Sequence, residues 1–287
     1  MDAVRDKPLT LDGYSGYEVA LVKDPKNGYI VIKKSKSKEK NERLIRQYEK
    51  HCFFQNLREE CFGVPEITGH GYDKDMFFYE YRFVEGSTLI KYIDGANQSD
   101  IENISDKLLK IMKHFASKSA IYYEKWAQMS MKEFLGKKVE ENCAKCGLDD
   151  EIRRKFLSKI GNLPEKGRCL CHGDFTFDNI IVDEKGELWL IDYLDVYPHY
   201  WMDVSKLFQD IDGGWYEIKH GSKLPMNKLF FMRQYLLGEM DKIDPDYRRF
   251  HNIFLAVAFL RILPYSKSET DRRLIVEKIK NFLNIDG

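Results

Sequence analysis

One stretch of the chain decides how the rest is interpreted: Cys169-Leu-Cys-His-Gly-Asp-Phe-Thr-Phe-Asp-Asn-Ile-Ile-Val-Asp-Glu-Lys-Gly-Glu-Leu-Trp-Leu-Ile-Asp192. It contains two short apolar runs, Ile180–Val182 and Leu188–Ile191, in which β-branched residues are frequent. A polar segment with Gly186 separates the runs, and glycine readily adopts the positive φ of a tight turn. The pattern predicts a strand, a loop and then a β-hairpin.

The turn also predicts a register for the hairpin. With its centre between Lys185 and Gly186, Asn179 stands opposite Asp192, with Cα atoms roughly 4.5–5.5 Å apart. An amide oxygen and a carboxylate are hard ligands of the kind that Mg²⁺ accepts when phosphates complete its coordination. Asn179 and Asp192 are therefore the candidate metal ligands, although a register one residue different would misalign them.

A candidate catalytic residue lies just upstream of the hairpin. Asp174, in His172-Gly-Asp, precedes Asn179 by five residues. In kinases an Asp at this spacing accepts the proton of the attacking hydroxyl, and the Asn binds metal. We therefore predict Asp174 as the catalytic residue and ATP and Mg²⁺ as cofactors. His172 is expected to brace the loop by hydrogen bonding.

Three segments in this order strengthen the interpretation: His-Gly-Asp-Phe-Thr-Phe-Asp-Asn-Ile-Ile-Val (172–182), Leu-Ile-Asp-Tyr-Leu-Asp (190–195) and Met-Asp-Val-Ser-Lys-Leu (202–207). They resemble the aminoglycoside phosphotransferase / choline kinase family, most specifically over about residues 168–210. The resemblance implies a protein-kinase-like α+β fold of two lobes, with a small antiparallel sheet in the N-terminal lobe and a mainly helical C-terminal lobe. It also implies phosphorylation of a small molecule, and a supporting role for Asp203 beneath the catalytic loop.

The length of 287 residues suits two lobes better than one small domain. Residues 1–83 are expected to form a nucleotide-binding lobe, and residues 84–287 a lobe with the catalytic loop, metal site and acceptor site. The boundary lies in a segment that resembles the family's linker, where the backbone of Arg82, Phe83 and Val84 is expected to bind adenine.

Composition excludes several partners. Acidic and basic residues number 46 each, so net charge favours neither nucleic acid nor an anionic membrane as a partner. The polar N-terminus and the shortness of the most apolar run, Ile253–Leu260, predict a cytoplasmic protein without a membrane span. That run is expected to form a buried helix. The oligomeric state stays open.

Phosphate-binding residues are expected near the N-terminus. Residues 9–34 have the composition of strands, and a nucleotide kinase needs a glycine-bearing hairpin and a lysine on a following strand. Gly13 and Gly16 are candidates for the hairpin, but the three-glycine pattern is incomplete and a plain turn fits as well. Lys33 is the candidate lysine, with Lys34 as the alternative.

A helix is expected over about residues 39–57, where apolar residues recur at helical spacing. In kinases a glutamate of this helix pairs with the strand lysine and fixes its ammonium. Glu49 is the candidate partner of Lys33, and Glu42 is the alternative. A plain surface position for Glu49 is also compatible with the sequence.

The remaining chain is mainly helical by its periodicity. Helices are expected over about residues 100–118, 129–146, 149–160, 201–211, 227–240, 244–263 and 274–283. Gly147 is the expected C-cap of the second, and Asp244 the expected N-cap of the sixth. Disulfides are not expected, and a zinc site built from Cys143, Cys146 and the segment Cys169-Leu-Cys171-His172 is the weaker interpretation of these cysteines.

The acceptor is not defined by the sequence. The aromatic residues in 193–201 could stack on a sugar or hold a quaternary ammonium by cation–π contact, or they could pack in the core. Asp195 could reach metal or substrate, or lie in solvent. A sugar or sugar-like alcohol is the first candidate, followed by choline or an aminoglycoside. ATP and GTP are not distinguished.

Two other functional classes compete with a small-molecule kinase. A protein Ser/Thr kinase is disfavoured because no Ala-Pro-Glu segment follows Asp192. A nucleotide-binding pseudokinase is disfavoured by the intact set of Asp174, Asn179 and Asp192, although the incomplete glycine pattern supports it.

Overall fold

The computed structural model describes residues 9–10, 17–26, 28–57, 60–118, 129–194, 199–221 and 223–285. The chain divides into two compact units. The first consists of Met1–Thr88 and Asn179–Asp195, and the second of Leu89–Asp178 and Val196–Gly287. The hairpin that follows the catalytic loop therefore groups with the N-terminal unit. The single boundary expected after residue 83 stays a prediction.

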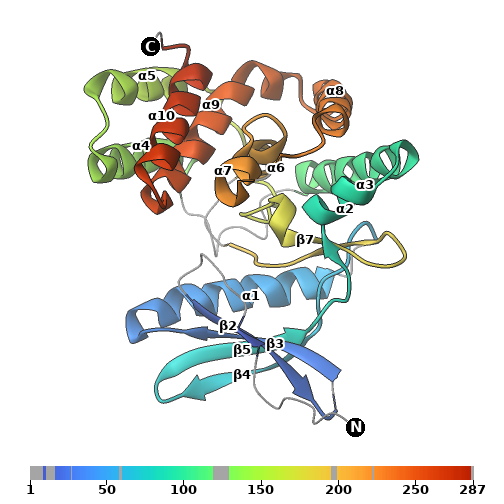
Figure 1. Cartoon of the computed structure of the whole chain (residues 1–287). Coiled ribbons are helices and arrows are strands. Elements are labelled where there is room, and N and C mark those ends of the chain that lie inside the picture. Colours follow the sequence, from blue (N-terminus) through green and yellow to red (C-terminus); the bar gives the residue numbers. More distant parts are fainter. Residues whose placement is uncertain are drawn as a thin grey trace. The chain divides into compact units, whose positions relative to one another are not determined.

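The first unit is built on a five-stranded antiparallel sheet in the order β1-β2-β3-β5-β4 (Figure 1). The strands are β1 (Leu9–Thr10), β2 (Tyr17–Asp24), β3 (Gly28–Ser35), β4 (Ile67–Asp73) and β5 (Met76–Arg82). After β3 comes a short 3₁₀ turn, Lys38–Lys40, and then helix α1 (Asn41–Leu57). The strands and the helix expected in this region are confirmed.

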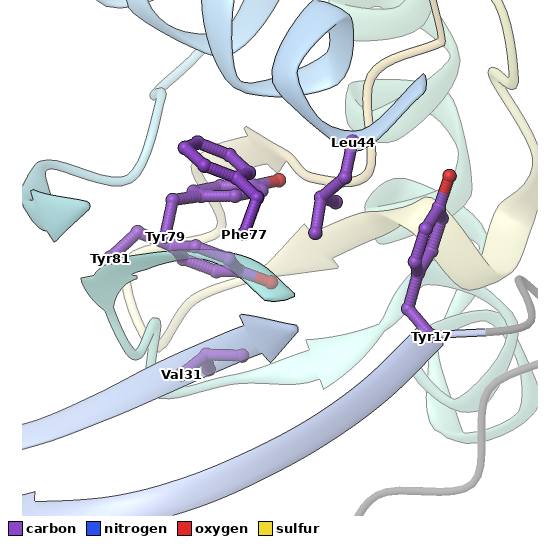
Figure 2. Packing of buried hydrophobic residues seen from close by; sticks show 6 residues of the cluster. All are labelled: Tyr17, Val31, Leu44, Phe77, Tyr79 and Tyr81. Carbon is purple, nitrogen blue, oxygen red and sulfur yellow. The ribbon is translucent and has the colours of Figure 1, made fainter. Parts of the chain in front are cut away.

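Helix α1 packs on one face of this sheet. The alternation of side chains along β5 places Phe77, Tyr79 and Tyr81 on the same face, where they are buried together with Val31 and Leu44 (Figure 2). Because Lys33 is two residues after Val31 on β3, it shares that buried face and is only 1% exposed. The candidate phosphate-binding lysine is thus buried on the same face of β3 as the core residue Val31.

A second sheet of the first unit contains the predicted hairpin. Its strands are β6 (Ser87–Thr88), β7 (Ile180–Val182) and β8 (Leu188–Leu190), all antiparallel, in the order β6-β7-β8. The hairpin is confirmed, but its predicted register is wrong by one residue. Ile180 pairs with Leu190, and the Ile191 N–H donates to the Asn179 carbonyl at 3.1 Å. Asn179 therefore stands opposite Ile191, not Asp192.

The turn explains this difference. The Asp183 N–H donates to the Glu187 carbonyl at 3.1 Å, so three residues lie between the paired ends of the strands. The Asp183 carboxylate also accepts from the N–H groups of Lys185 and Glu187, each at 2.9 Å. Gly186 takes a φ of +74°, as expected for the glycine of the turn. These side-chain bonds centre the turn on Lys185.

Gly63 lies against the hairpin at a position where no side chain fits. A Cβ atom there would lie 2.4–2.8 Å from the Trp189 ring. Backbone bonds of 2.7 Å to Leu188 and 3.0 Å from Leu190 hold Gly63 in place. We expect Gly63→Ala to lower the free energy of unfolding by about 1–3 kcal/mol, measured by urea denaturation.

Gly136 provides the control for this substitution. It lies inside a helix, and nothing approaches within 4 Å of the position that a Cβ atom would take there. Gly136→Ala is therefore expected to leave stability unchanged or raise it by up to about 1 kcal/mol. Equal stability of the Gly63→Ala and Gly136→Ala variants would show that the Trp189 contact does not constrain the hairpin.

The second unit is helical in the part that the structure describes. Its helices are α2 (Leu89–Gly95), α3 (Gln98–Ser117), α4 (Met131–Cys146), α5 (Asp150–Gly161), α6 (Trp201–Ile211), α7 (Trp215–His220), α8 (Met226–Ile243), α9 (Pro245–Ile262) and α10 (Glu269–Leu283). Helix α9 packs against α4, α6, α8 and α10 (Figure 1). Its run Ile253–Leu260 is buried, as predicted. Among the described residues no helix is long and apolar enough to cross a membrane.

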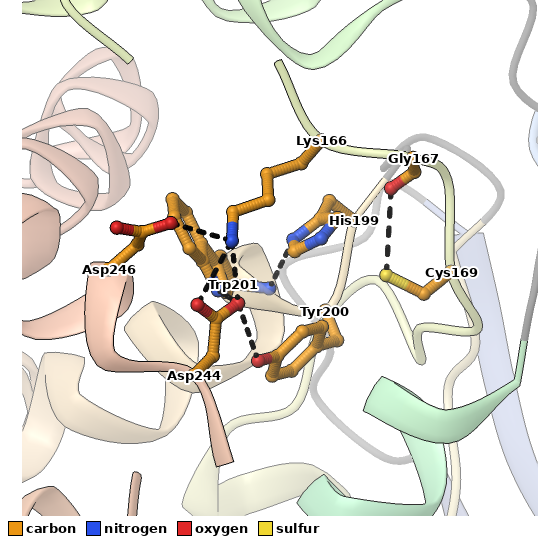
Figure 3. A network of polar contacts seen from close by, with 8 residues as sticks. All are labelled: Lys166, Gly167, Cys169, His199, Tyr200, Trp201, Asp244 and Asp246. Carbon is orange, nitrogen blue, oxygen red and sulfur yellow. Dashed lines mark hydrogen bonds and ion pairs between the residues drawn. The ribbon is translucent and has the colours of Figure 1, made fainter. Parts of the chain in front are cut away.

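Asp244 holds the start of α9 in an unexpected way. It occupies the predicted N-cap, but its side chain makes no capping bond. Its carboxylate instead binds Lys166 Nζ at 3.0 Å, the Tyr200 hydroxyl at 3.2 Å and Trp201 Nε1 at 3.0 Å (Figure 3). The network joins the segment that enters the catalytic loop to the starts of α6 and α9.

The cysteines form no disulfide in the structure. All six are free, and Gly147, with φ +58°, ends α4 after Cys146 as predicted. Burial raises the pKa of the Cys143 thiol to about 11 and that of Cys169 to about 12, so both stay protonated at neutral pH. Within the described ranges, no group of three or more His, Cys, Asp or Glu side chains could hold a metal ion.

Candidate active site

Lys33 on β3 is the buried centre of the site in the first unit. Its Nζ lies 2.9 Å from Asp192 Oδ1 and 5.4 Å from the centroid of the Tyr17 ring. Lys34 points to the opposite face of the strand and pairs with Asp73 at 2.5 Å. Of the two candidate lysines, Lys33 is therefore the one that lies beside Asp192, a predicted metal ligand.

The predicted pair of Lys33 with Glu49 is not what the structure forms. Among the described residues, the carboxylate paired with Lys33 is that of Asp192. Glu49 lies near Tyr48 and Cys52. Burial raises the pKa of the Tyr48 hydroxyl and of the Cys52 thiol, and the negative charge of Glu49 adds a smaller increase to each. Glu42, the alternative, pairs with Arg46 at 2.7 Å.

The phase of α1 explains the position of Glu49. The buried face of the helix carries Leu44, Gln47, Lys50, His51 and Phe54. Each residue advances the helix by about 100°, so Glu49 lies about 200° around the axis from the buried Gln47. The sheet-facing positions of α1 are thus filled by side chains other than Glu49.

Asp192 has an unusual backbone. Its φ is +61°, a region that residues other than glycine seldom adopt. Neighbouring contacts hold it: Tyr193 donates to the Leu190 carbonyl at 3.0 Å and stacks on Phe54 at 4.5 Å between centroids. Lys50 of α1 donates to the Leu194 carbonyl. Strained residues that are fixed from several sides are typical of functional sites.

The donor set at the end of the hairpin fits a magnesium ion. Asn179 and Asp192 flank the same end of β7 and β8 and offer an amide oxygen and a carboxylate. Both are hard oxygen ligands, and Mg²⁺ in kinases takes its further ligands from phosphate and water. The observed register places Asn179 opposite Ile191, so Asn179 and Asp192 stay candidate metal ligands on the chemistry of their side chains and not on the predicted pairing.

His51 on α1 lies beside this site and resists protonation. Its Nε2 is 2.7 Å from the Pro65 carbonyl. Burial lowers the pKa of His51 to about 4, the Pro65 hydrogen bond opposes this shift, and the charge of Lys33 adds to it. The folded state therefore keeps a neutral imidazole at pH values where the unfolded chain is already protonated.

This pKa predicts a loss of stability in acid. Because the folded value lies below 6.5, the contribution of the neutral ring is complete above about pH 6.5 and is lost as the pH falls toward 4. His51→Gln keeps an N–H for Pro65 and is expected to reduce the pH slope of the unfolding free energy by up to about 1.4 kcal/mol per pH unit. Denaturant titrations between pH 4 and 7 measure it. An unchanged slope in His51→Gln contradicts the prediction.

In the second unit, Asp203 of α6 holds the backbone of the catalytic loop. Its two carboxylate oxygens accept from the N–H groups of His172 at 2.5 Å and Gly173 at 2.8 Å. His172 is fully buried, and its Nδ1 accepts from the Asp174 N–H at 3.2 Å. The supporting role of Asp203 and the bracing role of His172 are confirmed.

Asp174 lies on this loop with its carboxylate 3.1 Å from Lys206 Nζ. Burial alone would raise the pKa of Asp174, but the charge and hydrogen bond of Lys206, with smaller effects of Arg261 and His172, lower it overall. The group is therefore a carboxylate at neutral pH, as an acceptor for a hydroxyl proton must be.

Further charged residues near the loop were not expected from the sequence. Lys219 of α7 pairs with Asp178 at 2.5 Å, and Asp210 of α6 accepts from the Tyr216 N–H at 2.8 Å. Burial, with the charge of Asp178 as the next cause, raises the pKa of Asp210 to about 7. Asp203, Lys206 and Asp210 recur at helical spacing, which is the sequence signal that could have revealed this face of α6.

The other predicted residues are placed as follows. Arg82 ends β5, its N–H donates to the Glu66 carbonyl at 2.8 Å, and the Phe83 N–H donates to Tyr29 at 2.9 Å. Val84 follows before β6. Gly13 and Gly16 lie outside the described residues, as do Asp195 and Tyr197. The adenine and phosphate contacts of these residues stay predictions.

The aromatic residues described in 193–201 pack in the interior. Tyr193, Tyr200 and Trp201 are at most 3% exposed, and His199 is 4% exposed. Burial lowers the pKa of His199 to about 3, so this ring is neutral. For these residues core packing, the alternative to acceptor binding, is what the structure shows.

A sheet with one packed helix, a buried lysine opposite a hairpin aspartate, and a His-Gly-Asp loop on a helical unit together define a kinase-like phosphotransferase. The chain belongs to the phosphotransferase enzyme family, whose APH model matches residues 10–215. No curated protein matches the sequence closely enough to count as a relative.

Solved structures with this fold include several kinases. A ternary complex of streptomycin, ATP and APH(2″)-IIa has a TM-score of 0.64 and 15% identity, covering 97% of this chain and 91% of that chain. Amicoumacin kinase hAmiN with AMP-PNP, Ca²⁺ and Ami has a TM-score of 0.62 and 12% identity, and the match covers 98% of this chain and 89% of that chain. The GDP complex of aminoglycoside 2′-phosphotransferase-IIIa has a TM-score of 0.63 and 17% identity, and the match covers 97% of this chain and 92% of that chain. The protein-kinase-like α+β fold predicted from the sequence is confirmed.

Proposed function

We propose that this protein transfers the γ-phosphate of ATP to a hydroxyl group of a small molecule. The observation that carries the proposal is the buried Lys33 ammonium 2.9 Å from Asp192, at the hairpin end that also bears Asn179. A buried lysine, a metal-binding carboxylate and an amide are the groups that a kinase uses to neutralise nucleotide phosphates.

Each residue has a distinct part in the reaction. Asn179 and Asp192 would hold Mg²⁺, which when bound offsets the charge of the phosphates. Lys33 would bind the α- and β-phosphates. Asp174 would accept a hydrogen bond from the acceptor hydroxyl, orient its oxygen, and take its proton as the new bond to phosphorus forms. Catalysis would rest mostly on positioning and electrostatics.

The nucleotide side is completed by residues that stay predictions. The backbone of Arg82, Phe83 and Val84 would bind adenine, and Gly13 and Gly16 would cover the phosphates.

We propose a sugar or an amino alcohol as the acceptor. The similar structures include an aminoglycoside phosphotransferase, amicoumacin kinase and a complex that holds streptomycin, so small molecules are the acceptors to examine first. The zero net charge of this chain favours a less cationic acceptor than an aminoglycoside.

Calorimetric binding of ATP and of GTP, each with and without Mg²⁺, is the first test. Wild type is expected to bind the magnesium complex, and Asp192→Ala is expected to lose the Mg²⁺ dependence. An acceptor screen over sugars, amino alcohols, aminoglycosides and peptides, with ADP release as the signal, then tests transfer. Absence of nucleotide binding contradicts the proposal, binding without transfer to any acceptor supports a pseudokinase, and transfer to peptides alone supports a protein kinase.

A further inference from the structure

Helix α6 carries polar side chains in an unusual setting. Every residue of Trp201–Ile211 is buried, yet Asp203, Lys206, Gln209 and Asp210 recur along one side of the helix. Buried polar groups need hydrogen-bond partners, and buried charges need opposite charges. The partners of Asp203 are backbone N–H groups of the catalytic loop. The partners of Lys206 lie on both the loop and the helix.

Lys206 joins two side chains through one ammonium. It is 6% exposed, and its Nζ lies 3.1 Å from Asp174 Oδ1 and 2.8 Å from Gln209 Oε1. An ammonium has three donors and no acceptor, so each bond also restricts the direction of the other. The long side chain of Lys206 is thereby held between the helix and the loop.

Gln209 is oriented by this contact. Only the amide oxygen can accept from an ammonium, so Oε1 must face Lys206. The Gln209 side chain is 1% exposed, and in the described part of the chain Nε2 has no hydrogen-bond partner. A buried donor without an acceptor is unfavourable. The hydrogen bond that the Gln209 side chain makes is therefore the one through its oxygen to Lys206.

We propose that Gln209 and Lys206 are positioning residues for the catalytic loop: Gln209 directs the Lys206 ammonium, and Lys206 fixes the carboxylate of Asp174. Asp203 of the same helix fixes the loop backbone, so one rigid element sets both the path of the loop and the direction of its acidic side chain. This inference rests on the proposed function, because Asp174 is the catalytic residue only in that reaction.

The electrostatics around Asp174 provide a signal specific to this role. The charged or titratable groups that act on its carboxylate include Lys206 of α6, Arg261 of α9 and His172 of the loop itself. Burial raises the pKa of Asp174, and these groups, Lys206 foremost, lower it. Removal of Lys206 therefore raises the pKa, whereas loss of packing alone would expose the group and relieve the effect of burial.

The test is a titration of the Asp174 carboxyl by ¹³C NMR in protein labelled at aspartate, with the signal assigned from its loss in Asp174→Asn. Wild type is compared with Lys206→Met, Lys206→Arg and Gln209→Leu. Lys219→Met is the matched control. It also removes one lysine cation from the second unit, but Lys219 pairs with Asp178 and not with Asp174. The kcat and KM of any acceptor found are measured in parallel.

Lys206→Met is expected to raise the midpoint of the Asp174 titration and to lower kcat by about 100-fold, with KM for the nucleotide unchanged. Gln209→Leu should act in the same direction and more weakly, Lys206→Arg should restore most of the loss, and Lys219→Met should leave the midpoint unchanged. An unchanged midpoint in Lys206→Met overturns the inference. If Lys206→Met does not fold, the Gln209→Leu variant decides. An unchanged Asp174 midpoint in Gln209→Leu then overturns the proposal that Gln209 and Lys206 position the Asp174 carboxylate. The titration needs no acceptor, so it decides the inference even where the proposed reaction fails.

Discussion

Replacement of Asp174 by Asn is expected to lower kcat for phosphoryl transfer by about 1,000-fold and to leave nucleotide affinity unchanged. Asparagine has the same shape, but its amide cannot take the proton of the acceptor hydroxyl. It also forfeits the ion pair with Lys206 at 3.1 Å, so the side chain is no longer oriented by charge. The groups proposed to bind the nucleotide, Lys33, Asn179 and Asp192, belong to the first unit and are not changed.

The two halves of this prediction need separate measurements. Steady-state kinetics at saturating nucleotide gives kcat, and calorimetry with MgATP gives the affinity. Asp149→Asn, which makes the same chemical change at an exposed position without a capping bond, should match wild type in both. If Asp174→Asn keeps more than about a tenth of the wild-type kcat, Asp174 is not the proton acceptor.

The elements that the sequence predicted best are those with local causes. Amphipathic helices in the second unit, the Gly147 C-cap and the β7–β8 hairpin follow from periodicity and from the backbone preferences of single residues. Helix α7 was missed because six residues from Trp215 to His220 are too few to show a helical period. Short elements such as this one depend on their neighbours for stability.

The errors in the site arose where the structure depends on contacts that a local sequence pattern does not record. The hairpin register depended on bonds of the Asp183 carboxylate that periodicity does not encode. Glu49 was predicted because in kinases a glutamate of this helix pairs with the strand lysine. In α1, however, the buried face contains Gln47, Lys50 and His51, and Glu49 is not among its buried residues.

Lys206 illustrates what only the structure provides. Its partner Asp174 lies on a loop 32 residues earlier, and no local pattern connects the two residues. Helical spacing places Lys206 on the same side of α6 as Asp203, but it does not say that this side faces the loop. The distinction between an exposed surface lysine and a buried positioning residue therefore requires the tertiary fold.

Asp203 is the residue whose loss should affect both stability and activity. Its carboxylate is 1% exposed and accepts from two N–H groups of the catalytic loop. Hydrogen bonds to a buried charged group stabilise by about 1.5–3 kcal/mol each, and unpaired donors carry a further penalty. Asp203→Ala is therefore expected to lower the free energy of unfolding by about 3 kcal/mol, and to lower kcat by about 100-fold because the loop is no longer fixed.

Asp203→Asn separates the two effects. Its amide oxygen can still accept from one of the two N–H groups, so stability should fall less than in Asp203→Ala, while the direction of Asp174 is still disturbed. Asp241→Ala is the control, because its carboxylate pairs with Arg248 at the surface, and its loss should change stability by less than about 1 kcal/mol. Urea denaturation and steady-state kinetics measure both quantities. If Asp203→Ala is as stable as Asp241→Ala, the part assigned to Asp203 in holding the backbone of the catalytic loop must be given up.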